Sequence, residues 1–249
     1  MASQGPWLPV RDGNAENAGP PPEVHEIREW ISAAFSELDD QGREVGDAKF
    51  GVYAFFDYDG EPIYVGQTRE SLRTRIRRHL TNQRTDAVAM SVLDPFEVLE
   101  VAMWPLWELE DVGSPQGERT KRLNDAEFTV FQAVLAESSF SAVLNEKDPP
   151  TGDWASLPES VRVRIVPDDV YELRRHPDTR IARRAETIAA LAKVIGERSV
   201  SKGLRRTLLT QARRLEALAR GRYDEVAGEP PVEDPGEETG EEAAPGNED

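Results

Sequence analysis

Cysteine is absent from the 249 residues, and no run of 18 apolar residues occurs. The first absence excludes disulfides, thiolate chemistry and cysteine-based metal sites, and the second argues against a membrane-spanning helix. The first residues also lack the basic and apolar regions of a signal peptide, so none is expected. These absences predict a cytoplasmic protein without a membrane partner. An apolar content of 38% allows a core of modest size.

Basic residues are fewer than acidic ones, but they are concentrated in two segments. The formal net charge is −17, and residues 223–249 hold eleven acidic residues and no lysine or arginine, which leaves −6 on residues 1–222. Residues 69–84 hold six arginines against one glutamate, and residues 180–222 hold twelve basic residues against three glutamates. Nucleic-acid affinity depends on local phosphate contacts, so these segments are compatible with a nucleic-acid partner.

Composition divides the chain into four parts. Residues 1–22 are rich in glycine and proline and are predicted to be disordered, and residues 223–249 are predicted to form an acidic disordered tail. Between them we expect a domain over residues 23–158 and a basic helical region over residues 159–222. The tail is expected to aid solubility. A sharper hypothesis is that it covers basic surfaces and weakens nonspecific DNA binding.

Hydrophobic periodicity and turn residues predict the order of elements. The expected helices cover residues 24–38, 70–80, 124–138, 181–195 and 204–218, and the expected strands cover residues 50–56, 62–65, 96–106 and 160–166. Residues 107–122 are expected to form a loop, and an Asn or Asp near residue 124 is expected to cap the following helix. This order predicts an α/β (α+β) fold with a mixed or antiparallel sheet, followed by a C-terminal helical hairpin.

The segment GVYAFFDYDGEPIYVG, residues 51–66, predicts a β-hairpin that carries Tyr53 and Tyr64. A two-residue turn at positions 58–59 or 59–60 points both rings to the same face of the sheet. A three-residue turn points them to opposite faces. The alternative to a functional role is that the paired rings only pack against each other.

Glycines stand at both ends of this pattern. Gly51 and Gly66 have no side chain, so the backbone of a ligand could approach closely there. Turn geometry is the alternative explanation for both glycines.

The next predicted helix buries a stripe formed by Leu72, Ile76 and Leu80. Arg75 and His79 are four residues apart, border this stripe, and should lean toward the sheet. One arginine and one histidine beside two tyrosines form a plausible anion site, because the guanidinium binds phosphate with a fixed fork. The other arginines of this helix are expected to point to solvent.

The motifs GVY and YVG, whose tyrosines are eleven residues apart, and the following LRTRIRRH together resemble the GIY-YIG nuclease family. The resemblance covers residues 51–145. It implies a small three-stranded antiparallel sheet flanked by helices, and cleavage of phosphodiester bonds with one divalent metal ion, Mg²⁺ or Mn²⁺.

Site residues are carried over from the family motif in order. The resemblance implies that Tyr53 activates or positions the attacking water, and that Tyr64 binds this water or the scissile phosphate. Arg75 matches the arginine that stabilises negative charge on the phosphate. His79 matches a histidine that homing and some restriction members carry four residues later.

The resemblance also implies a metal-binding glutamate on a later helix and an asparagine after that helix. Glu127 fits the first position and Asn145 the second, with Glu118 and Glu137 as weaker alternatives for the metal ligand. A single carboxylate suffices because Mg²⁺ keeps most of its waters. Some members carry a lysine directly after YIG, where this chain has Gln67, and glutamine cannot act as a base.

Apart from Arg75, exposed arginines are expected to attract phosphate diffusely. They are Arg69, Arg73, Arg77, Arg78, Arg205 and Arg206. The C-terminal basic region is interpreted either as a DNA-binding module or as a helical hairpin that packs on the catalytic domain or forms a homo-oligomer.

The sequence thus predicts a metal-dependent endonuclease, most directly one that acts on DNA. The main alternative is a catalytically silent domain that binds nucleic acid or a protein. RNA cleavage is a third reading, which the lack of an evident aromatic stacking platform for single strands disfavours.

Overall fold

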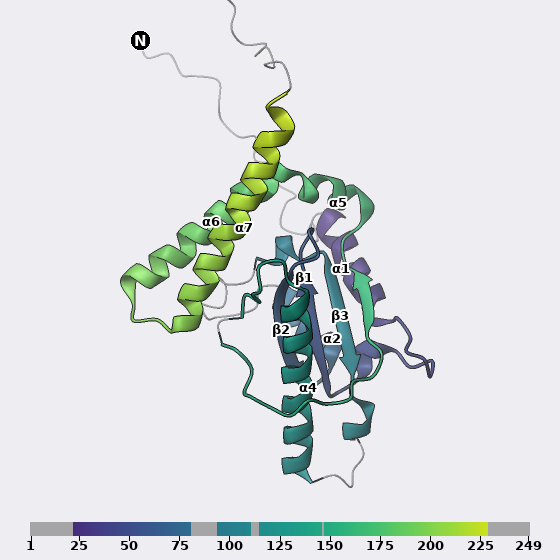
Figure 1. The fold of residues 1–249 in the computed structure, drawn as a ribbon. Coiled ribbons are helices and arrows are strands. Elements are labelled where there is room, and N and C mark those ends of the chain that lie inside the picture. Colours follow the sequence, from purple (N-terminus) through teal and green to yellow (C-terminus); the bar gives the residue numbers. More distant parts are fainter. Residues whose placement is uncertain (1–21, 81–93, 111–114, 146, 229–249) are drawn as a thin grey trace, which may run out of the picture.

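The structure, a computed structural model, describes residues 22–80, 94–110, 115–145 and 147–228 (Figure 1). Its α-helices are α1 (Pro22–Phe35), α2 (Leu72–Leu80), α4 (Gln116–Glu137), α5 (Asp168–Arg175), α6 (Pro177–Glu197) and α7 (Lys202–Val226). Its strands are β1 (Gly51–Phe56), β2 (Pro62–Thr68), β3 (Glu100–Pro105) and β4 (Val161–Arg164). Short 3-10 helices are η2 (Val45–Asp47), η3 (Pro95–Glu97) and η4 (Trp107–Glu110).

The four strands form one antiparallel sheet in the order β2-β1-β3-β4. The predicted α+β class is therefore confirmed, and β4 adds a fourth strand beside the three that the resemblance implied. Val161 and Val163 of β4 pack against the core, which explains why the alternating segment joins the sheet. In the described part of the chain, no helix combines the length and the apolar content needed to cross a membrane.

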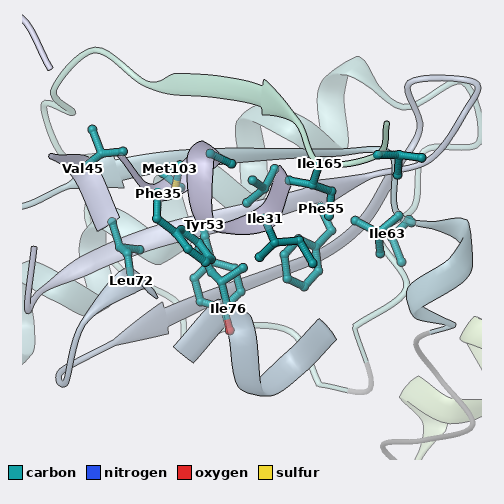
Figure 2. Close-up of a cluster of buried hydrophobic side chains, with 14 of the residues drawn as sticks. Ile31, Phe35, Val45, Tyr53, Phe55, Ile63, Leu72, Ile76, Met103 and Ile165 are labelled. Carbon is teal, nitrogen blue, oxygen red and sulfur yellow. The ribbon is translucent and has the colours of Figure 1, made fainter. Parts of the chain in front are cut away.

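Helices cover the sheet on both faces (Figure 1). Alternate residues of β1 enter two cores: Tyr53 and Phe55 pack with α1 and α2, whereas Val52 and Ala54 pack with α4. Figure 2 shows the first core, in which Phe35 lies close to Tyr53. All six residues of β1 are buried, as expected for a strand with neighbours on each side and helices on both faces.

The hairpin register places the two motif tyrosines on one face, as the shorter turns predicted. Tyr53 lies opposite Gly66, and Tyr64 lies opposite Phe55. The turn has three residues, 58–60, as the hydrogen bond from the Asp57 N–H to the Glu61 carbonyl oxygen at 3.0 Å shows. By itself such a turn would point the two rings to opposite faces. A register shift between Phe55 and Phe56 compensates for the longer turn and restores the shared face.

The predicted loop over residues 107–122 is wrong in its second half, because α4 begins at Gln116. The residue before it, Pro115, has the fixed φ that suits a helix start, and no side chain caps the helix there. Residues 116–118 are exposed, so no apolar period marked this first turn. The predicted Asn or Asp cap near residue 124 is also wrong, since Asn124 and Asp125 lie within the helix.

The C-terminal region contains the predicted helical pair and one helix that the periodicity did not reveal. Leu191, Val194 and Leu204 are buried in the core between α6 and α7. The additional helix α5 has only eight residues and is bounded by prolines. Helix α7 ends at Val226 and so includes the first four residues of the predicted acidic tail, 223–226.

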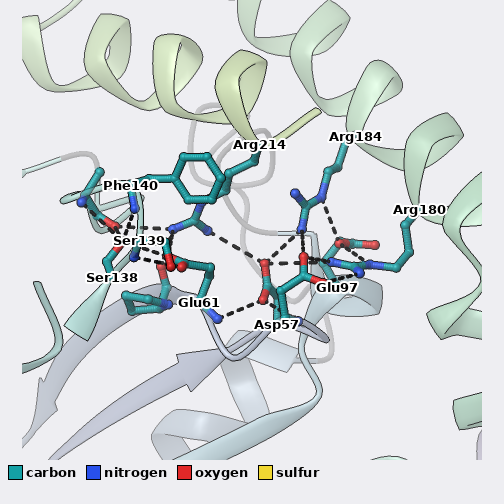
Figure 3. A network of polar contacts seen from close by, with 12 residues as sticks. Asp57, Glu61, Glu97, Ser138, Ser139, Phe140, Arg180, Arg184 and Arg214 are labelled. Carbon is teal, nitrogen blue, oxygen red and sulfur yellow. Dashed lines mark hydrogen bonds and ion pairs between the residues drawn. The ribbon is translucent and has the colours of Figure 1, made fainter. Parts of the chain in front are cut away.

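Three buried arginines of helices α6 and α7 form ion pairs with carboxylates of the β1–β2 turn (Figure 3). Arg180 binds both carboxylate oxygens of Asp59, at 2.8 and 2.6 Å. Arg184 Nη2 donates to Asp57 Oδ2 at 2.9 Å. The paired charges lie on α6 and on the hairpin turn, so they join segments more than 100 residues apart.

The third arginine comes from α7 and contacts both the turn and the segment after α4. Arg214 Nη2 donates to the Pro62 carbonyl at 3.1 Å and lies 3.4 Å from Glu61 Oε2. Glu61 in turn accepts a hydrogen bond from the Ser138 hydroxyl at 2.7 Å. These contacts support the alternative in which the C-terminal hairpin packs on the preceding domain.

Candidate active site

The two motif tyrosines and the helix histidine form a compact group of rings. The ring centroids of Tyr53 and Tyr64 are 6.1 Å apart, and that of His79 lies 5.6 Å from Tyr53 and 5.1 Å from Tyr64. The Tyr53 hydroxyl is 3.3 Å from His79 Nδ1. Tyr53 and His79 are buried, whereas Tyr64 is partly exposed. Tyr64 is therefore the member of this group that a substrate can reach.

The motif glycines make room for parts of the protein itself, which corrects the expectation that a ligand backbone approaches there. A Cβ on Gly66 would lie 2.7 Å from Tyr64 Cε1 and 2.8 Å from the Tyr53 hydroxyl. A Cβ on Gly51 would lie 2.9 Å from the Trp104 carbonyl oxygen. Gly66 thus allows both tyrosine rings to lie over β2.

Arg75 lies beside the two tyrosines, as the helical wheel predicted. It is partly buried and hydrogen-bonds to the Tyr53 hydroxyl. Burial opposes its charge, but Tyr53, Tyr64 and Glu70 outweigh this and raise the pKa of Arg75 above its usual value. The Arg75 Nε is buried without a hydrogen-bond partner among the described atoms. The side chain is thus a cation with one buried N–H group that no described atom accepts.

Glu127 lies on the other side of the edge strand β2. Gln67 Nε2 donates to Glu127 Oε2 and to Asn124 Oδ1, both at 2.9 Å. Burial raises the pKa of Glu127, although the Gln67 hydrogen bond and the charge of Arg75 oppose this effect. Gln67 thus connects Glu127 to the strand that also carries Tyr64.

Asn145 uses its whole side-chain amide to pair with the edge of β2. Its Oδ1 accepts from the Val65 N–H at 2.9 Å, and its Nδ2 donates to the Val65 carbonyl at 2.8 Å. The Leu144 N–H also donates to the Ile63 carbonyl. Asn145 therefore holds the edge strand directly before Gly66, in a supporting position.

A divalent metal ion is implied by the resemblance, and the residues at Glu127 fit a largely hydrated ion. One carboxylate oxygen of Glu127 is held by Gln67, and the Gln67 Oε1 is a buried oxygen without a hydrogen-bond partner among the described atoms. Oxygen ligands and few carboxylates suit Mg²⁺ and Mn²⁺. The described residues include no group of three or more His, Asp or Glu that could hold a metal, so a closed all-protein site is not formed there.

The alternative metal ligands lie apart from this group. Glu118 is exposed in the first turn of α4, and Glu137 is exposed at its last residue. Of the three candidate glutamates, Glu127 is the one that is partly buried and hydrogen-bonded to β2.

The arginines expected to attract phosphate differ in their surroundings. Arg73, Arg78 and Arg206 are each paired with a carboxylate, at 2.7, 2.5 and 2.8 Å. Such pairs offset part of the positive charge that a phosphate would meet. The exposed members are Arg69, Arg77, Arg205 and Arg206.

Comparison with known proteins agrees with the motif. Residues 49–109 match the family model described as the GIY-YIG catalytic domain, which confirms the resemblance over this segment. The match indicates a hydrolase domain of the nuclease type, and nucleic acid as the class of partner. Glu127 and Asn145 lie beyond the matched residues. Neither the curated proteins nor the solved structures gave a significant match.

Sequence reasoning missed the contact between Gln67 and Glu127. A signal for it was present, because side chains alternate along a strand and Gln67 therefore shares the face of Val65. Val65 belongs to the core formed with α4, which is the helix that carries Glu127. Gln67 was interpreted only as a departure from the lysine of other members.

Proposed function

We propose that this protein is a divalent-metal-dependent endonuclease that hydrolyses phosphodiester bonds in DNA. The observation that carries the proposal is the arrangement around β2. The partly exposed Tyr64 and the cationic Arg75 lie on one side of the strand, and the partly buried Glu127 lies on the other.

In this proposal, Arg75 binds the scissile phosphate and stabilises the negative charge that develops on it. Its guanidinium is charged at neutral pH, and although burial lowers its pKa, Tyr53, Tyr64 and Glu70 outweigh that effect. Tyr64 orients the attacking water or the phosphate through its hydroxyl. Tyr53 and His79 are buried behind Tyr64 and fix its ring and the Arg75 side chain by packing and hydrogen bonding.

Glu127 would hold Mg²⁺ or Mn²⁺ through the carboxylate oxygen that Gln67 does not bind. When bound, such an ion supplies Lewis-acid stabilisation of the phosphate and of the leaving oxygen. Asn145 positions the strand that carries Tyr64. The exposed arginines contribute a diffuse attraction for the phosphate backbone, and the compartment we propose is the cytoplasm.

The test is cleavage of plasmid DNA by purified protein with Mg²⁺ or Mn²⁺. We expect Arg75→Ala to lower the rate about 10²–10³-fold, the usual effect of removing one donor to a developing oxyanion, and Glu127→Gln to abolish metal-dependent cleavage. Arg213→Ala and Glu118→Gln are matched controls that should retain activity, because both residues are exposed and neither belongs to the proposed site.

Cleavage that persists in both site variants would place the active site elsewhere. A lack of cleavage of duplex DNA, single-stranded DNA and RNA with either metal would refute the endonuclease proposal and favour a binding domain.

A further inference from the structure

Gln67 connects the strand of the YVG motif to the candidate metal ligand. Its Nε2 carries two N–H groups, and each is used: one for Glu127 Oε2 and one for Asn124 Oδ1, both at 2.9 Å. Asn124 and Glu127 are three residues apart on α4 and so share one face of the helix. The amide is thereby held by two acceptors on a rigid helix and by its own strand.

This arrangement determines which way the amide faces. The ionised Glu127 carboxylate only accepts hydrogen bonds, so the Gln67 nitrogen faces it, and Asn124 presents its oxygen to the same nitrogen. The Gln67 Oε1 is buried and has no hydrogen-bond partner among the described atoms, which is unfavourable as long as it stays unsatisfied. The side chain therefore presents a buried oxygen acceptor next to a carboxylate that has one oxygen engaged.

Building on the proposed function, we propose that Gln67 is a positioning residue for the metal ion at Glu127. It fixes one oxygen of the Glu127 carboxylate and turns the other toward the ion. Its own Oε1 would be an acceptor for a water molecule bound to the ion. Ligating carboxylates are commonly hydrogen-bonded in this way, and loss of such a partner typically weakens metal affinity about 10–100-fold.

The role differs from that of a lysine at the same position. A lysine would place a positive charge beside the carboxylate and so compete with the metal ion. The neutral amide donates hydrogen bonds without adding charge. Glutamine at this position therefore retains orientation of the ligand and avoids electrostatic competition.

The test is titration of Mn²⁺ into the full-length protein without nucleic acid, followed by electron paramagnetic resonance of the free ion. Four proteins are compared: wild type, Gln67→Met, Glu127→Gln and the double variant. Methionine has a similar length to glutamine and lacks both hydrogen-bonding groups. Gln132→Met is the matched control, since Gln132 lies on a different face of α4.

We expect Gln67→Met to raise the Kd for Mn²⁺ about 10–100-fold and Gln132→Met to leave it unchanged. In the Glu127→Gln background, Gln67→Met should have no further effect, because it acts through that carboxylate. Asn124→Ala removes one of the two acceptors that hold the amide and should weaken Mn²⁺ binding in the same direction. This variant also provides a test if Gln67→Met does not fold, which a thermal melt would reveal.

The two proposals fail in different ways. If Glu127→Gln lowers Mn²⁺ affinity but Gln67→Met and Asn124→Ala do not, the role of Gln67 is refuted and the metal site stands. If wild type and Glu127→Gln bind Mn²⁺ equally, or neither binds it, the metal site at Glu127 is refuted together with the role of Gln67.

Discussion

Replacement of Asp57 by asparagine tests whether buried charge holds the C-terminal helices on the hairpin. Asp57 is 2% exposed, and its Oδ1 accepts the N–H groups of Asp59 and Glu61, each at 2.9 Å. Its Oδ2 lies 2.9 Å from Arg184 and 3.8 Å from Arg214. Asparagine keeps the shape and the acceptor of the turn, so the substitution removes the charge with little change in packing.

The expected loss is large because the arginines stay buried. Removal of one partner of a buried ion pair typically costs about 3–5 kcal/mol, since the remaining charge is left without compensation. The Asp59 and Glu97 carboxylates still contact the arginines, so we expect a value near the lower end, about 3 kcal/mol. For a chain of this size, that corresponds to a decrease in Tm of about 6–12 °C.

The assay is urea unfolding at pH 7, followed by far-UV circular dichroism and by tryptophan fluorescence. Asp148→Asn is the matched control: Asp148 forms a two-point pair with Arg206, but both side chains are more than 40% exposed. This pair should contribute at most about 1 kcal/mol and should weaken with salt.

If Asp57→Asn lowers the free energy of unfolding as little as Asp148→Asn does, buried charge at Asp57 does not hold the C-terminal helices on the hairpin. Burial raises the pKa of Asp57, and the charges of Arg184 and Arg214 oppose this effect.

Two further predictions concern the site. Burial raises the pKa of Glu127 above its ordinary 4.5, and metal binding needs the ionised form. The Kd for Mn²⁺ should therefore rise as the pH falls through this raised pKa, at a higher pH than for an exposed glutamate. Gln67→Met removes a hydrogen bond that lowers the pKa of Glu127, so the affinity for Mn²⁺ should begin to fall at a still higher pH. An unchanged pH profile of the Kd in this variant would contradict the prediction. Gly66→Ala should displace both motif tyrosines, lower Tm by the equivalent of about 1–3 kcal/mol and reduce cleavage. By contrast, a Cβ at Gly117 would have no atom within 4 Å, so Gly117→Ala should raise stability by up to about 1 kcal/mol. Equal effects of the two alanine substitutions on Tm would show that the contact at Gly66 is not tight.

The sequence alone determined most helices and strands, and it determined which side of helix α2 lies against the sheet. Apolar spacing over Leu72 and Ile76 placed Arg75 and His79 beside the tyrosines, because side-chain direction in a helix depends only on residue spacing. Alternation fixes which residues share a face within β1 or within β2, but Tyr53 and Tyr64 share a face because a register shift between Phe55 and Phe56 offsets the longer turn. Prediction failed where no local signal existed, as at the exposed first turn of α4 and the short helix α5.

The tertiary structure decided which distant groups meet. Gln67 and Glu127 are 60 residues apart, and only the packing of α4 against β2 brings the amide to the carboxylate. The basic C-terminal region was interpreted either as a DNA-binding module or as a packed helical hairpin. In the structure, Arg180 and Arg184 of this region form ion pairs with the acidic turn of the β-hairpin. The reason is physical: residue spacing determines the direction of a side chain on its own element, whereas its partner depends on how the elements dock.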